Sequence, residues 1–474
     1  MFTKILQWIK GVLFRMLGTS TVKQALNVDI AISSDMVNAL QLWTQMYENK
    51  APWLSKDIKS LNLPAAIASE IARAVTIEMR VDVSGSPRAD FLNAQLAPVI
   101  DKLREQVEKC CAKGGMMMKP YVRNGEIDVD FIQADQFFPV SFDNKGKITS
   151  AVFVDQRTVG QDYYTRLEAH AITPQGCLIR NLAYKSTTRD FLGSPVPLTA
   201  VSDWADLQPE ALITGIDRPL FAYFRYPMAN NIDANSPLGV SCYSRAASGD
   251  TCLIQQADEQ WSNLLWEFES GQRALYADVL AFEKKTDGTV ILPQKRLYRA
   301  LNGSSNIGDN PEGLFHEWTP TLREQNILNG LDAILRKIEF ACGLAYGTLS
   351  NPATVDKTAT ELKMSNQRSY ATISDTQKAL KNALDDLLYA MDIWATLDKL
   401  APKGTYSAVY DFDDSIVIDK DLQFQQDMRL VNAGLMSKVE FRMRNFGEDE
   451  ATAKKKIADV QAEQPKETDL FAGA

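Results

Sequence analysis

Few side chains in this sequence have the types and spacing that enzyme catalysis requires. The chain contains two histidines, His170 and His316, so a Ser–His or Cys–His pair would have to use one of them. His170 lies in a run that alternates apolar and polar residues, and His316 lies close to Trp318. Packing or surface roles explain both histidines more simply than catalysis does.

The motifs that bind nucleotide phosphates or activate a serine are also missing. A P-loop requires GxxxxGK followed by Ser or Thr, and Gly146-Lys147 lacks both the first glycine and the following hydroxyl. A nucleophile elbow requires GxSxG, whereas the sequence from Gly239 reads GVSCY. We therefore expect that the protein is not an enzyme and, in particular, not a P-loop ATPase.

Metal and cofactor sites lack a local signature as well. The six cysteines show no CxxC spacing, and the adjacent Cys110 and Cys111 are expected to be reduced packing residues. Asp411, Asp413 and Asp414 offer oxygen ligands for a hard cation, but the EF-hand glycine and terminal glutamate are absent. A solvated strand end is the simpler interpretation, and we expect neither a metal nor a cofactor.

Acidic residues gather on one expected helix. No basic residue occurs between Arg245 and Arg273. Like charges one turn apart destabilise a helix, so this acidity does not serve local stability. The net charge of −9 also argues against a protein that coats DNA with a basic surface, although it permits one that lets DNA pass. The acidic residues are Asp250, Asp258, Glu259, Glu267 and Glu269.

The first half of the chain predicts an α+β domain. Helical patterns cover residues 34–80 and 88–112, and Pro98 is expected to kink or split the second helix. Alternating runs from 127 to about 185 then predict strands, and Asn124-Gly125 is a hairpin signal.

The second half predicts helices around a small β insertion. A helix is expected over 241–271, followed by an insertion at 275–318 that carries a strand pair. Thr319-Pro320 then has the form of a helix start, and the apolar stripe that follows ends at Gly343.

One long helix is expected from Lys357 to about Leu397. Its apolar residues recur at an average step of 3.5 residues, as in a coiled-coil seam. At 1.5 Å per residue the helix would be roughly 60 Å long, which is too long for one compact domain to bury. Asn366 and Gln377 interrupt the seam, so we expect the first half to contact other backbones closely or to face water.

The two ends of the chain also predict helices. Residues 2–17 form an amphipathic pattern that could lie on a membrane or dock on protein. Near the C-terminus, Ser437 and Glu440 form a capping box, Gly447 ends that helix, and 448–463 predicts the last one.

Three blocks of the sequence, and the order of its parts, resemble the portal proteins of long-tailed, siphovirus-type bacteriophages. The most specific block is KTATELKMSNQRSYATISDTQKAL at 357–380, which looks like the Thr-Ala-Thr-Glu signature that opens the family's long helix. Residues 411–450 are a second similar block, and 235–246 are a third and weaker one.

The resemblance implies a multi-domain α+β portal fold that assembles into a ring. The implied parts are a wing at 1–240, stem helices at 241–271 and 319–343, a clip at 272–318, a tunnel loop at 344–356, a long helix at 357–400, and a C-terminal wing strand with crown helices at 401–474.

The resemblance also implies a function. The protein would form a dodecameric ring at one capsid vertex, through which double-stranded DNA is packaged and ejected. Its partners would be other copies of itself, the terminase large subunit, a head–tail adaptor, the major capsid and scaffolding proteins, and DNA bound without sequence specificity. It would be assembled in the host cytoplasm and reside in the virion. The alternative is a non-enzymatic ring- or rod-forming scaffold or adaptor of another assembly, associated with a membrane through the N-terminal helix.

Site residues follow from the same resemblance. The expected channel-lining acids are Asp258, Glu259, Glu267 and Glu269. The tunnel-loop residues expected near DNA are Tyr346, Thr348, Ser350, Asn351, Thr354 and Lys357, with Lys357 as a transient phosphate contact. The residues expected to pack neighbouring subunits are Thr358, Thr360, Asn366, Tyr370 and Gln377.

Overall fold

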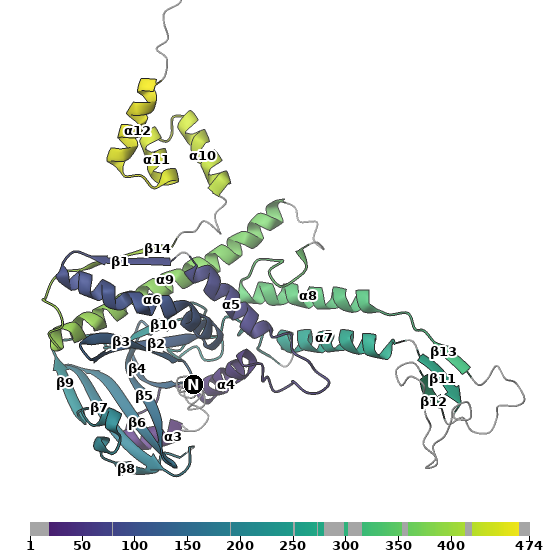
Figure 1. The fold of residues 1–474 in the computed structure, drawn as a ribbon, viewed down its shortest axis with the longest axis horizontal. Coiled ribbons are helices and arrows are strands. Elements are labelled where there is room, and N and C mark those ends of the chain that lie inside the picture. Colours follow the sequence, from purple (N-terminus) through teal and green to yellow (C-terminus); the bar gives the residue numbers. More distant parts are fainter. Residues whose placement is uncertain are drawn as a thin grey trace, which may run out of the picture. The chain divides into compact units, whose positions relative to one another are not determined.

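The computed structural model divides the chain into two compact units, Met1–Tyr410 and Asp411–Ala474. Each unit is described by itself, with the element labels of Figure 1. The expected amphipathic helix at 2–17 lies outside the described residues. The structure describes residues 19–77, 79–189, 191–249, 252–272, 274–278, 298–301, 315–352, 359–412 and 420–463.

Four helices come first among the described residues of the first unit. They are α3 (Thr19–Leu26), α4 (Ser34–Tyr47), α5 (Leu63–Thr76) and α6 (Pro87–Lys113). The helical pattern of residues 34–80 is thus divided in two, because Asn49 and Asn62 adopt the left-handed conformation at either end of the linker. The expected split at Pro98 was wrong, since α6 continues through this proline and ends at Gly114, whose φ is +84°.

A three-stranded sheet follows α6. Its order is β10 (Ala222–Arg225), β2 (Gly115–Arg123) and β3 (Glu126–Gln133), and all pairs are antiparallel. Asn124 and Gly125 both have positive φ between β2 and β3, which confirms the predicted hairpin turn. Helices α6 and α9 both contact β2 and β3, so this sheet belongs to the core of the unit.

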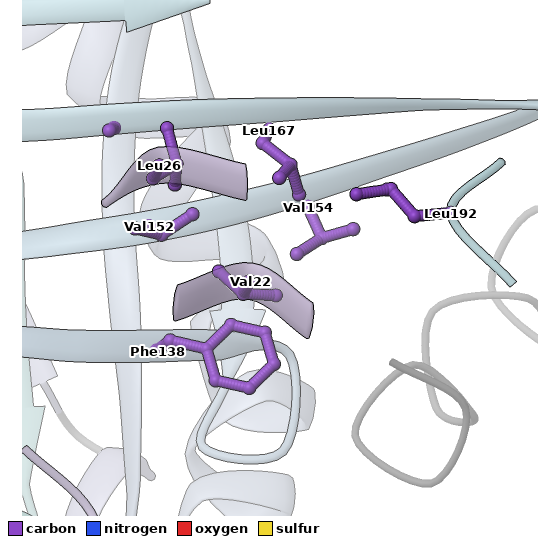
Figure 2. Close-up of a cluster of buried hydrophobic side chains, with 8 residues drawn as sticks. Val22, Leu26, Phe138, Val152, Val154, Leu167 and Leu192 are labelled. Atoms are coloured by element: carbon purple, nitrogen blue, oxygen red, sulfur yellow. The ribbon is translucent and has the colours of Figure 1, made fainter. Parts of the chain in front are cut away.

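A larger antiparallel sheet carries the alternating runs. It contains β4 (Phe137–Phe142), β5 (Ile148–Val159), β6 (Asp162–Thr173), β7 (Gly176–Ser186) and β8 (Ser194–Val196), with β9 (Glu210–Thr214) also paired to β7. Figure 2 shows how α3 contributes to its core: Val22 and Leu26 lie beside apolar side chains of β4, β5 and β6. Those strand residues include Phe138, Val152 and Leu167.

The expected helix over 241–271 begins later than its pattern suggested. Helix α7 spans Leu253–Ser270, and the residues before it form buried turns. The cause is tertiary: Cys242 N donates to Cys111 O at 2.9 Å, so this backbone binds the end of α6 instead of its own helix. Gly114 and Gly239 meet there so closely that a Cβ on either would clash with the other's backbone.

Helices α7 and α8 (Glu324–Cys342) lie side by side, and a small sheet is inserted between them in sequence (Figure 1). Its central strand β11 (Ala274–Asp278) pairs in parallel with β12 (Tyr298–Leu301) and antiparallel with β13 (Phe315–Trp318). Most of the expected strand pair lies at 279–297, outside the described residues, and the described strands of the insertion form a three-stranded sheet. The expected start of α8 at Thr319 was wrong by several residues.

Helix α9 (Ala359–Leu397) confirms the single long helix, and its 39 residues span about 60 Å. Its C-terminal half is buried, whereas the expected contact with other backbones or with water concerns the first half. The C-terminal half packs against α5, α6 and the β10-β2-β3 sheet. Its fully buried residues include Leu380, Leu384, Leu387 and Met391.

Strand β14 (Ser407–Phe412) pairs with β1 (Met79–Ser84), which places Asp411 in a strand. Asp413 and Asp414 lie outside the described residues. In the part of the chain that the structure describes, no group of three metal-ligating side chains comes together, and no helix is long and apolar enough to cross a membrane. All six cysteines are buried and free, as expected of packing residues.

The second unit contains α10 (Lys420–Asn432), α11 (Lys438–Phe446) and α12 (Glu450–Glu463). Ser437 accepts a hydrogen bond from Glu440 N at 3.0 Å, and Gly447 ends α11 with positive φ, so the N-cap at Ser437 and the helix end at Gly447 are confirmed. The carboxylate of Glu448 binds Arg442 and Lys456, which lowers the pKa of Glu448 to about 2.

Candidate functional site: the α7–α8 helix pair and the loop that follows

The first feature of the helix pair is a buried carboxylate on α7. Asp258 is 3% exposed and accepts hydrogen bonds from Trp53 Nε1 at 2.9 Å and Leu61 N at 2.8 Å. One turn later, Ser262 Oγ accepts from Lys59 N at 2.7 Å. Burial raises the pKa of Asp258. These bonds join α7 to the segment between α4 and α5.

A second carboxylate joins α7 to α8. Glu267 Oε1 accepts from Arg323 N at 2.9 Å, and Glu267 Oε2 accepts from Arg323 Nη2 at 2.8 Å. The hydrogen bonds from Arg323 lower the pKa of Glu267. Because Arg323 directly precedes α8, this ion pair holds the end of α7 against the start of α8, where the small sheet is inserted.

These contacts correct two predicted site residues. Asp258 and Glu267 were expected to line a channel, but each is buried and bonded within its own subunit, so the prediction was wrong for both. Glu269 is exposed, and Glu259 is partly exposed and accepts from Gln255 Nε2 at 2.8 Å. A channel-lining role for Glu259 and Glu269 stays a prediction.

A sequence signal for the buried position of Asp258 existed. Asp258 lies four residues, or about one helical turn, from both Ile254 and Ser262, and all three are buried. Helical spacing places Glu259 on a different face of α7 from Asp258, because successive residues are rotated by about 100° around the helix. The outward face of α7 is instead apolar around Trp266, which is 61% exposed, and Phe340 is exposed on α8. The other exposed apolar residues of the pair are Leu265, Phe268 and Leu328.

The loop after α8 begins with a well-formed helix end. Gly343 has a φ of +73°, and Leu344 N donates to Glu339 O at 2.9 Å. Gly343 N donates to Phe340 O, which completes a Schellman motif. A Cβ at position 343 would clash with the Thr372 side chain of α9, so this turn requires glycine for both its φ and its close packing.

The Glu339 carboxylate holds the loop itself. Its Oε1 accepts from the backbone N–H groups of Gly347, Leu349 and Ser350 at 3.1, 2.6 and 2.8 Å. Its Oε2 accepts from Ser350 Oγ at 2.9 Å. Sequence reasoning missed Glu339, because its partners are mainly backbone groups that no residue pattern reveals.

The predicted tunnel-loop residues take different positions. Ser350 is buried and donates to Glu339, so its side chain does not face water, and its expected place near DNA stays a prediction. Tyr346 is partly buried, and the Arg368 guanidinium of α9 lies 5.2 Å from its ring centroid. Thr348 and Asn351 are exposed. Thr354 and Lys357 lie outside the described residues.

The predicted subunit-packing residues are described only in part. Thr358 lies outside the described residues. For Thr360 and Asn366 the structure describes only the backbone, which is part of α9. Tyr370 and Gln377 are both partly exposed on α9. Their role in packing neighbouring subunits stays a prediction.

The family comparison covers the helix pair and the loop, but not the segment between α4 and α5. The chain matches the family model described as phage portal protein, SPP1 Gp6-like, over residues 99–467. The chain belongs to this portal protein family. The match begins inside α6 and continues beyond α12, so it includes the helix pair, the loop and α9. A search of curated proteins found no match. As a portal protein, the chain is a structural component of a bacteriophage capsid.

Proposed function

We propose that this portal protein assembles into a closed dodecameric ring at one capsid vertex, and that double-stranded DNA passes through the ring during packaging and ejection. The observation that carries this proposal is the family match over residues 99–467, which includes both helices of the pair. The protein acts as a conduit and not as an enzyme. Assembly takes place in the host cytoplasm.

The surface of the helix pair supports subunit assembly. Trp266 and Phe268 are exposed on α7, and Phe340 is exposed on α8. Leu265, Trp266 and Phe268 are exposed together at the end of α7, whereas Phe340 lies near the other end of the pair, since Glu267 binds Arg323 at the start of α8. Large apolar side chains that gather on a surface mark an interaction site, because their burial removes apolar area from water. A neighbouring subunit that covers these residues fits a ring built by repeated head-to-tail contacts.

The charge balance supports a channel that does not retain DNA. The net charge is −9, and Glu259 and Glu269 are the acids of α7 that remain at least partly exposed. Carboxylates repel phosphates, whereas retention would require clustered Lys and Arg. We assign Glu259 and Glu269 to the channel wall and Lys357 to a transient phosphate contact.

The partners follow from the same proposal. The terminase large subunit and the head–tail adaptor dock on the insertion at 272–318, and the major capsid and scaffolding proteins contact the N-terminal part of the chain. A membrane-associated scaffold is the alternative, and among the described residues nothing favours it.

A phage that lacks this gene tests the function. We expect infected cells to accumulate capsids without DNA, and we expect a plasmid copy of the wild-type gene to restore DNA-filled capsids. A phage that lacks a tail gene is the control, because its capsids should still fill. DNA-filled capsids in the absence of this protein would refute the proposal.

A further inference from the structure

We infer that Glu339 is the positioning residue of the loop that follows α8, and that it couples this loop to the helix pair. We call residues 344–352 the loop base. The inference rests on the proposed function, which places this loop beside DNA. Glu339 acts on the loop and not on DNA, because its side chain is 0% exposed.

The geometry around Glu339 is that of an occupied anion site. Three backbone N–H groups, from Gly347, Leu349 and Ser350, converge on one carboxylate oxygen within 3.1 Å. Converging backbone N–H groups of this kind form concavities that bind anions. Here the anion is a side chain of the preceding helix, so these N–H groups are not free to bind a phosphate of DNA.

A second carboxylate of α8 holds the far end of the loop base. Asp332 Oδ1 accepts from Asn351 N at 2.7 Å, and Asp332 also forms an ion pair with Arg336 at 2.7 Å. Asp332 and Glu339 lie seven positions apart, which places them on the same side of the helix two turns apart. The loop base is therefore fastened along α8 at two points.

Helix α9 also contacts the loop base and the end of α8. The guanidinium of Arg368 lies 4.5 Å from the ring centroid of Phe340 and 5.2 Å from that of Tyr346. Thr372 Oγ1 donates to Gly343 O at 3.2 Å. The loop base, the end of α8 and this part of α9 are thus bonded to one another.

This arrangement has a mechanical consequence. If the loop base left Glu339, a carboxylate inside the protein would lose charge-assisted hydrogen bonds, which are roughly twice as strong as neutral ones. A force that passing DNA applies to the loop is therefore transmitted to α8 and is not absorbed within the loop base.

The test uses Glu339→Gln in the full-length protein, with hydrogen exchange followed at single amides. Glutamine keeps the shape of the side chain but removes its charge and one acceptor, so the amides of Gly347, Leu349 and Ser350 should exchange about tenfold faster. Amides of α7 should exchange at the wild-type rate, which shows that the fold is intact. Lys337→Gln is the matched control, because it changes one charge on an exposed residue of the same helix.

The second readout is DNA packaging by phage that carry each variant. Glu339→Gln should form rings as the wild type does but yield several-fold fewer DNA-filled capsids, whereas Lys337→Gln should package normally. Unchanged exchange at 347–350, or faster exchange with normal packaging, would each overturn the inference. Failure of the proposed function appears separately, as normal packaging by phage that lack the protein entirely.

Discussion

Replacement of Glu168 by glutamine is expected to lower the free energy of unfolding by about 3 to 5 kcal/mol. Glu168 lies in β6 and accepts from Lys119 Nζ at 2.7 Å, contacts His170 Nε2 at 2.7 Å and pairs with Arg166 Nη2 at 3.1 Å. Lys119 and His170 are buried. Without the carboxylate, the Lys119 ammonium and the Arg166 guanidinium would lose their shared counterion inside the protein. Urea unfolding of the full-length protein, followed by circular dichroism, measures the loss.

Two variants separate this cluster from a general effect of substitution. Glu210→Gln removes an exposed carboxylate from β9 of the same sheet and should change stability by less than about 0.5 kcal/mol. Lys119→Met combined with Glu168→Gln should be less destabilising than Glu168→Gln alone, because the unpaired ammonium is gone. A loss below about 1 kcal/mol for Glu168→Gln would contradict the account.

The same cluster makes stability depend on pH in one direction. Burial raises the pKa of Glu168, but Lys119, His170 and Arg166 outweigh it and hold the pKa well below its ordinary 4.5. Its contribution is complete above pH 4.5 and is lost as the pH falls through the folded-state pKa. Burial lowers the pKa of His170 from 6.5, so on acidification His170 is protonated in the unfolded state at a higher pH than in the folded state. This difference favours the unfolded state at low pH. Both groups therefore reduce stability on acidification. In Glu168→Gln, the loss of stability that occurs below pH 4.5 because Glu168 is protonated should disappear.

Replacement of Arg88 by alanine is the second large loss that we expect, at about 3 kcal/mol or more. Arg88 is 1% exposed and donates to Ala401 O at 2.8 Å, to Pro402 O at 3.0 Å and to Thr396 Oγ1 at 3.2 Å. The last carbonyls of α9 already accept hydrogen bonds from the backbone N–H groups of Asp398, Lys399 and Leu400. Arg88 instead ties the segment that follows α9 to the start of α6, and its positive charge near the C-terminal end of α9 stabilises the helix dipole. The loss is again measured by urea unfolding.

The control for Arg88 lies on the same helix. Arg104→Ala removes an exposed arginine of α6 and should change the unfolding free energy by less than about 0.5 kcal/mol. Amides of β14 should also exchange faster in Arg88→Ala, because the segment between α9 and β14 is held by Arg88 and by the bond from Ser86 Oγ to Thr405 O at 2.7 Å. Equal stability of the two arginine variants would show that the buried guanidinium does not hold the segment that follows α9.

Local signals predicted much of the fold. The turn at Asn124-Gly125, the cap at Ser437 and the helix end at Gly343 each depend on a few neighbouring residues, and the structure confirms all three. The long helix α9 was also predictable, because its apolar spacing continues without Gly or Pro. Its burial was not, because the sheet that covers it comes from a distant part of the chain.

The site was less predictable, because its buried charges depend on distant partners. Asp258 binds Trp53 and Leu61, about two hundred positions earlier in the chain, and Glu267 binds Arg323 across the inserted sheet. The position of a carboxylate in the sequence does not show whether its side chain faces water or a bonding partner. The sequence offers no signal for the position of Glu339, because its partners are mainly backbone N–H groups, which are present at almost every residue.

Single-particle cryo-EM of the purified full-length protein tests the central claim most directly. The account predicts a closed dodecameric ring with a central opening, in which Trp266 and Phe268 of each subunit are covered by a neighbouring copy. A monomer, or an open rod in which these side chains stay exposed, would contradict the proposal that this portal protein forms the DNA channel of the capsid.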